Sequence, residues 1–276
     1  MPLFRSRISW IAALICVPVA VSAAGLQPAT LGAWTTYLSW TQARVAHELT
    51  SADKFLALDF GPAAQRERRA VLAGALVTTK MDTVDGGGRG LGVPSALVHH
   101  WRGAVLIPGV TLARLMAVLR HEAPPPDDDV VASRVLSGGP DRMTVFLRIK
   151  RSSIVSVVYD TEHTITFGHQ GRRRATSTSE ATKIAEVSDP NTPNERELSA
   201  AEDHGFLWRL NSYWRYEEMP GGVIAECESV SLSRRAPLVV GYLVHPLIEA
   251  TARESMQRTL GSLKSRFAQS VSAAAY

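Results

Sequence analysis

The last third of the chain is the part that most constrains the fold. Residues 204–217 and 222–234 each have the residue types and the alternation of a β-strand. Residues 237–268 then carry apolar side chains at helical spacing, as one long amphipathic helix would. A strand pair that leads directly into a long helix is typical of a sheet that grips a helix and leaves a cavity beside it. We therefore expect a protein that encloses an apolar ligand.

The earlier segments predict further helices and an antiparallel sheet. The expected helices cover residues 30–49, 51–60 and 108–119. The expected strands cover residues 71–84, 91–105, 130–136, 143–150, 152–167 and 174–187, and the first two form a hairpin around a glycine-rich turn. A run of strands without alternating helices favours the α+β fold class with an antiparallel sheet.

The N-terminus has the features of a secretory signal peptide. Arg5 and Arg7 precede an apolar run at residues 8–20, and small side chains follow at residues 22–24. An uncleaved anchor helix is the alternative, but the apolar run is short for a membrane span. We expect residues 1–24 to be removed and the mature protein to be periplasmic or secreted.

The charge pattern gives little support for a charged partner. The formal net charge is +4, and the basic clusters at residues 66–69 and 172–174 stand in polar surroundings. We expect them to form a solvated surface, with weak contact to an anionic membrane surface as the alternative. Aromatic side chains are not interleaved with these clusters, so we expect no nucleic-acid partner.

The sequence does not predict a metal, a cofactor or a known catalytic motif. His163 and His169 are too far apart along a strand to form an obvious ligand pair, and no zinc-like cysteine pair exists. The Gly-x-Ser-x-Gly motif of serine hydrolases is also missing. Loss of the leader would remove Cys16 and leave Cys227 as one buried, inert thiol.

The closing segments resemble a known superfamily. The stretch 208–216, the stretch 222–234 and the helical residues 252–255 are similar to secreted bacterial members of the START-like, polyketide-cyclase-like helix-grip (SRPBCC) superfamily. The resemblance implies a curved antiparallel sheet around a long C-terminal helix, with an apolar cavity for lipids, sterols or polyketides. It implies a ligand-binding domain at residues 63–270, with residues 25–62 as an added N-terminal helical extension.

The direction in which the closing strands face stays open at this stage. Apolar alternation alone turns Trp208 inward and leaves Arg209, Arg215, Glu226 and Glu228 as an outer ladder of charges. In the alternative, Arg209, Tyr213, Glu226 and Glu228 face the cavity, and a glutamate could serve as a general base. The candidate ligand-binding residues from both interpretations and from the final helix are Trp208, Arg209, Tyr213, Ala225, Glu226, Glu228, Tyr242 and Met256.

We therefore expect the protein to bind or transport a hydrophobic small molecule, with a lipid as the first candidate. One alternative is a cyclase- or aromatase-type enzyme that uses the same cavity. Another is an envelope interaction protein with a vestigial cavity, which would be favoured by a large apolar patch on the helices of residues 30–60.

Overall fold

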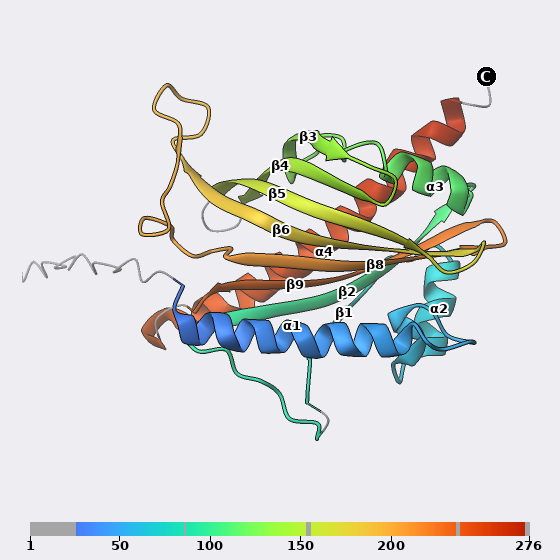
Figure 1. Cartoon of the computed structure of the whole chain (residues 1–276), viewed down its shortest axis with the longest axis horizontal. Helices are drawn as coiled ribbons and strands as arrows, with labels where there is room; N and C mark the ends of the chain where they lie inside the picture. The colour runs from blue at the N-terminus through green and yellow to red at the C-terminus, as the bar shows by residue number, and fades with distance from the viewer. Residues whose placement is uncertain (1–25, 86, 153–155, 236–237, 274–276) are drawn as a thin grey trace, which may run out of the picture.

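The protein is built on one antiparallel sheet with helices on both faces (Figure 1). The computed structural model describes residues 26–85, 87–152, 156–235 and 238–273, and in the last helix it describes the side chains of residues 249–268. The strands are β1 (Val77–Lys80), β2 (Ala96–Pro108), β3 (Val130–Gly138), β4 (Arg142–Ser152), β5 (Ser156–His169), β6 (Arg174–Ser188), β7 (Arg196–Glu197), β8 (Arg209–Met219) and β9 (Gly222–Arg234). Their order is β1-β2-β9-β8-β6-β5-β4-β3, and β7 pairs with β6.

The helices divide between the two faces of this sheet. They are α1 (Pro28–Glu48), the short 3-10 helix η1 (Ala57–Phe60), α2 (Ala64–Leu72), α3 (Leu112–Leu119) and α4 (Leu238–Ala273). We call the face that packs against α3 and α4 the inner face, and the face that packs against α1, η1 and α2 the outer face. The expected grip of a long C-terminal helix by a curved sheet is confirmed, as is the α+β class. No helix in the described part of the chain is both long and apolar enough to span a membrane.

The inner face holds the main hydrophobic core. Alternate residues of β2 and β9 meet side chains of α3 and α4 there, among them Val105, Cys227 and Leu260. Gly103 of β2 lies directly beneath α4, because a Cβ atom at this position would come within 2.8 Å of Met256. The missing side chain is what allows the helix to approach the sheet so closely.

Over β1, β2, β8 and β9, the outer face is covered by the N-terminal helices rather than by solvent. Trp34 and Tyr37 of α1 pack on Val230 and Leu232 of β9, and a second cluster around η1 includes Leu58. The helical segment expected at residues 25–62 therefore forms a layer of its own on the sheet. Helix α2 continues this layer beyond residue 62.

Several sequence-based boundaries were wrong. Of the helix expected at residues 51–60, only the 3-10 helix η1 forms. The expected strand at residues 71–84 is replaced by the end of α2 and the short strand β1, because residues 64–70 are mostly good helix formers. The expected helix start at Pro108 is instead the end of β2. Helix α3 begins after Thr111, whose side chain accepts a hydrogen bond from the Arg114 backbone N–H at 3.3 Å.

The expected hairpin and the alternation of the middle strands are confirmed. Strand β1 pairs with β2 in antiparallel register, from Val77 opposite Ala104 to Lys80 opposite Trp101. In β4, every second residue from Met143 faces inward, as the sequence pattern predicts.

Candidate functional site

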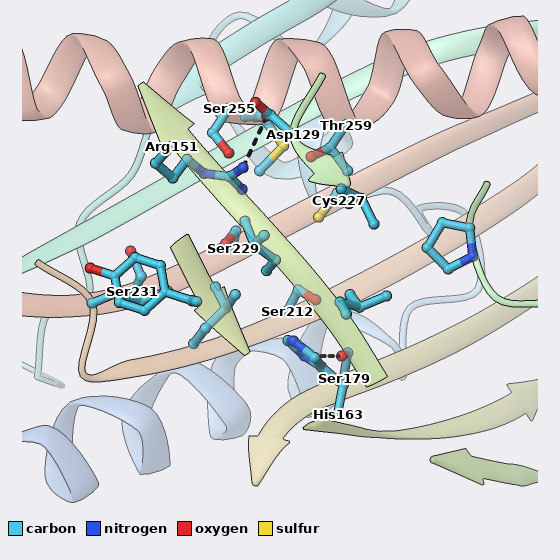
Figure 2. Close-up of a pocket in the computed structure, with 18 of the residues that line it drawn as sticks. Asp129, Arg151, His163, Ser179, Ser212, Cys227, Ser229, Ser231, Ser255 and Thr259 are labelled. Atoms are coloured by element: carbon cyan, nitrogen blue, oxygen red, sulfur yellow. Dashed lines mark hydrogen bonds and ion pairs between the residues drawn. The ribbon is translucent and has the colours of Figure 1, made fainter. Parts of the chain in front are cut away.

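A large cavity lies between the inner face of the sheet and α4 (Figure 2). Its volume is about 730 Å³. Its walls come from β2, β4, β5, β6, β8, β9 and α4, so every long central strand of the sheet contributes side chains to it. The apolar lining includes Trp101, Met143, Val145, Leu147, Ile149, Val157, Ile165, Phe167, Leu210, Trp214, Met256 and Leu263.

One part of the cavity wall is a corner of paired charges. Arg151, at the end of β4, places its Nη1 atom 3.2 Å from Asp129 Oδ2. Arg258 of α4 donates from its Nε atom to Asp129 Oδ1 at 2.9 Å. Burial lowers the pKa of Arg151, and the charge of Asp129 opposes this shift. The charges in this corner therefore compensate one another and hold the start of β3 against α4.

A second polar group on the wall centres on His163 of β5. Its Nδ1 atom is 3.3 Å from the Ser179 hydroxyl of β6, and its Nε2 atom is 3.0 Å from the Thr161 hydroxyl. Burial lowers the pKa of His163 to about 4, so the imidazole is neutral near pH 7. Ser212 of β8 and Ser229 of β9 also line the cavity, and Figure 2 shows them on the same side as Ser179.

The cavity reaches the surface beside the loop that precedes β8. His204, Phe206 and Leu207 of this loop are among the lining residues. Phe206 is half exposed, at 50%, and its ring stacks on that of His204 at a centroid distance of 6.0 Å. Phe206 therefore places an exposed aromatic side chain at the rim of the cavity.

The predicted ligand-binding residues are divided between several places. Met256 of α4 lines the cavity. Ala225 is on the inner face but is fully buried in the hydrophobic core, away from the cavity wall. Trp208 comes before β8 begins and packs against the cluster of the outer face, which corrects its expected inward position. The side chain of Tyr242 lies outside the described residues.

The charged candidates are on the outer face, which corrects the interpretation that put them in the cavity. Glu226 accepts hydrogen bonds from the backbone N–H groups of Ala57 and Leu58, at 2.5 and 2.9 Å. Tyr213 belongs to the cluster formed with α1. Arg209 shares the parity of Tyr213 along β8 and bonds to the Trp208 carbonyl. The physical reason is that α1 and η1 bury this face, so polar parity does not mean exposure to solvent.

Glu228 belongs to a buried network of hydrogen bonds and ion pairs beneath α1. It accepts from His100 Nε2 at 2.7 Å and forms an ion pair with Arg44. The Tyr37 hydroxyl lies 2.8 Å from His100 Nδ1. Burial opposes the ionisation of Glu228, but the His100 hydrogen bond and the Arg44 charge together lower its pKa. The predicted cross-strand ladder is therefore replaced by other partners: Arg215 pairs with Glu48 of α1, and Glu228 pairs with Arg44 of α1 and His100 of β2.

Sequence reasoning missed the polar residues that do line the cavity. Asp129 was interpreted as part of a solvated loop, but it is only 8% exposed. Arg151 continues the inward parity of Met143 and Ile149, and this signal could have identified it. His163 was considered only as a metal ligand. Among the described residues, no group of three or more His, Cys, Asp or Glu side chains could hold a metal ion.

Comparison with known proteins gives similarity at the level of structure. No family model matches the chain, and no curated protein matches it. The STAR-related lipid transfer protein of Xanthomonas axonopodis is similar to it, with 15% identity, a TM-score of 0.39, and coverage of 69% of this chain and 98% of that one.

Two further solved structures show the same kind of similarity. Human StAR-related lipid transfer protein 5 has 13% identity and a TM-score of 0.43, and covers 87% of this chain and 98% of its own. The Zhui aromatase/cyclase of Streptomyces sp. R1128 has 15% identity and a TM-score of 0.34. Its alignment covers 63% of this chain and 96% of the aromatase/cyclase chain. At these identities the similarity concerns the fold alone.

Proposed function

We propose that this protein binds a hydrophobic small molecule in the cavity between the inner face and α4. The observation that carries the proposal is the cavity itself, whose volume of about 730 Å³ is lined mainly by apolar side chains. Protein interiors are normally close-packed. A void of this size, with a mainly apolar surface and polar side chains set into it, has the character of a ligand site.

The energetics suit a ligand of lipid size. Burial of apolar surface contributes roughly 25 cal/mol per Å². A ligand that buries about 300 Å² of apolar surface would therefore gain roughly 7 kcal/mol before the cost of its immobilisation. A lipid is our first candidate, and the exposed Phe206 at the rim supports exchange with a membrane or another carrier there.

In its described residues, the structure lacks the features that would favour the two alternatives, a cyclase-type enzyme and an envelope interaction protein. A cyclase-type enzyme with Glu226 or Glu228 as general base would need these carboxylates in the cavity, but both are on the outer face. A protein that docks a partner through an apolar patch on residues 30–60 would expose large hydrophobic side chains there. Within the described chain, the exposed large hydrophobic residues are Leu72, Val84, Val131, Val135, Leu136 and Phe206, and all are elsewhere.

Native mass spectrometry of the purified protein, followed by solvent extraction, tests the proposal. We expect a co-purifying apolar molecule, or 1:1 uptake of an apolar dye such as diphenylhexatriene by protein from which it has been extracted. A protein that carries nothing and takes up neither the dye nor any lipid of a broad panel would overturn the proposal.

We also propose that residues 1–24 are a cleaved signal peptide and that the mature protein is periplasmic or secreted. The basic start, the apolar run and the small residues that follow support this. N-terminal sequencing of the exported protein should begin near residue 25, and retention of Met1 would contradict it. Weak contact of the basic clusters with an anionic membrane stays a prediction, although Arg68 is already paired with Asp59 and Glu217.

A further inference from the structure

A row of polar side chains crosses the inner face at right angles to the strands. Ser179 of β6 is opposite Ser212 of β8. Ser212 is opposite Ser229 of β9, which in turn is opposite Trp101 of β2. All four line the cavity, and Figure 2 shows the three serines side by side on its floor. Side chains directly opposite each other in antiparallel strands have Cβ atoms about 4.5–5.5 Å apart, so the row is continuous.

The hydrogen bonds of His163 fix what Ser179 can offer a ligand. Thr161 donates its hydroxyl hydrogen to the Leu147 carbonyl at 2.9 Å. Its oxygen can therefore only accept from His163, whose Nε2 atom must carry the imidazole hydrogen. The unprotonated Nδ1 atom then accepts from the Ser179 hydroxyl. Ser179 presents only lone pairs to the cavity, so it requires a ligand group that donates a hydrogen bond.

The rest of the row consists of one hydrogen-bond donor and two hydroxyls that can either donate or accept. The indole N–H of Trp101, which can only donate, has no hydrogen-bond partner in the described part of the chain. No hydrogen bond to the hydroxyl of Ser212 or Ser229 occurs there either, and each hydroxyl can donate or accept. The row therefore begins with an acceptor, continues through two hydroxyls that can donate or accept, ends beside the buried and unpartnered indole N–H, and carries no charge.

The charged corner of the cavity is a poorer site for a ligand head group. Arg151 and Arg258 both pair with Asp129, and Arg151 also donates to the Lys150 carbonyl at 3.1 Å. An acidic ligand would have to displace Asp129 from these contacts. On the serine row, an acidic ligand could accept from Ser212 and Ser229, but it would also face the lone pairs of Ser179 and would find no cation, and a buried charge without an opposite charge is costly.

We propose that the row of Ser179, Ser212, Ser229 and Trp101, with His163 as a positioning residue, binds an uncharged, hydroxyl-bearing group of the ligand. This inference rests on the proposed function and names the chemical class of the ligand. A hydroxyl group can both donate to Ser179 and accept from the other members of the row, whereas a carboxylate can only accept. The apolar remainder of the ligand then packs against β4, β5 and α4.

A pair of probes with one acyl chain and two head groups tests the inference. Monooleoylglycerol has an uncharged head with two hydroxyls, and oleate has the same chain with a carboxylate. Competition against diphenylhexatriene should show that the full-length protein binds monooleoylglycerol at least tenfold more tightly than oleate at pH 7. The triple variant Ser179→Ala/Ser212→Ala/Ser229→Ala should lose at least tenfold in affinity for monooleoylglycerol but keep its affinity for the dye.

The control carries three serine-to-alanine changes away from the cavity, at Ser39, Ser137 and Ser188, and should bind as the unaltered protein does. Retained dye binding by the cavity variant shows that it has folded. If the dye binds but oleate binds as tightly as monooleoylglycerol, or the cavity variant discriminates as the parent does, the inference falls and the proposed function stands. If neither the dye nor either lipid binds, both fall.

Discussion

At the residue scale, the most unusual group is a carboxyl buried where no ligand reaches it. Glu226 is 1% exposed and is held by two backbone N–H groups of the η1 segment. Burial raises its pKa to about 7 against the charges of Arg215 and Arg102. An unfolded glutamate has a value near 4.5, so the native state retains a proton that the unfolded state has already lost between these two pH values. Stability should therefore fall as the pH rises through this window.

Replacement of Glu226 by glutamine tests this assignment. Glutamine cannot ionise, so the decline in stability that Glu226 contributes between about pH 4.5 and 7 should disappear in the variant. Each unit of pKa difference corresponds to about 1.4 kcal/mol, so the variant should gain roughly 2–3 kcal/mol relative to the parent across this range. Urea unfolding at several pH values measures the difference. A constant difference between the two proteins would show that Glu226 has an ordinary pKa.

At the element scale, the central feature is the close packing of α4 against β2. Gly103 has no side chain where Leu260 and Met256 cross the strand, and this contact sets how far α4 lies from the inner face. The long helix and its apolar stripe could be predicted from the sequence, because the spacing of Met256, Leu260 and Phe267 is helical. The position of the contact could not, because it depends on which glycine of the sheet lies beneath the helix.

Replacement of Gly103 by valine should disrupt the packing of α4 against β2 and lower the stability of the fold. A Cβ atom at this position would come within 2.5 Å of Leu260 Cδ1, and overpacking of this kind costs roughly 1–3 kcal/mol. Thermal unfolding should show a lower Tm. Gly261→Ala in α4 is the matched control, because nothing lies within 4 Å of its added Cβ. This control should stabilise the helix by about 0.5–1 kcal/mol. A Gly103→Val protein as stable as the parent would mean that α4 does not rest on this strand.

At the scale of the whole molecule, both faces of the sheet are buried where β2, β8 and β9 pass between the N-terminal helices and α4, and this explains which sequence predictions succeeded. The apolar parity of Leu210 and Trp214 indicated the inner face, and both residues line the cavity. The same pattern could not show that Arg215 is also buried, where it donates to Glu48 of α1 at 2.5 Å. Polar alternation normally indicates solvent, and only the tertiary packing of α1 shows otherwise.

The cavity wall shows the same limit. Sequence alternation identified the apolar side chains of β4, but the serine row needs the register between β6, β8 and β9. Ser179, Ser212 and Ser229 are far apart in the chain and come together only through that register. A single serine within a strand carries no signal of its own, so this part of the site was missed.

One measurement tests the central claim, that the space beneath α4 is a ligand site. Ala252 of α4 lines the cavity, whereas its neighbour Arg253 is exposed. Ala252→Trp should fill the cavity, and Arg253→Trp adds the same ring outside it. Titration with diphenylhexatriene should show 1:1 binding that Arg253→Trp retains and that Ala252→Trp weakens at least tenfold, with both variants folded by circular dichroism. Equal binding by the two folded variants would contradict the claim that the ligand lies in this cavity.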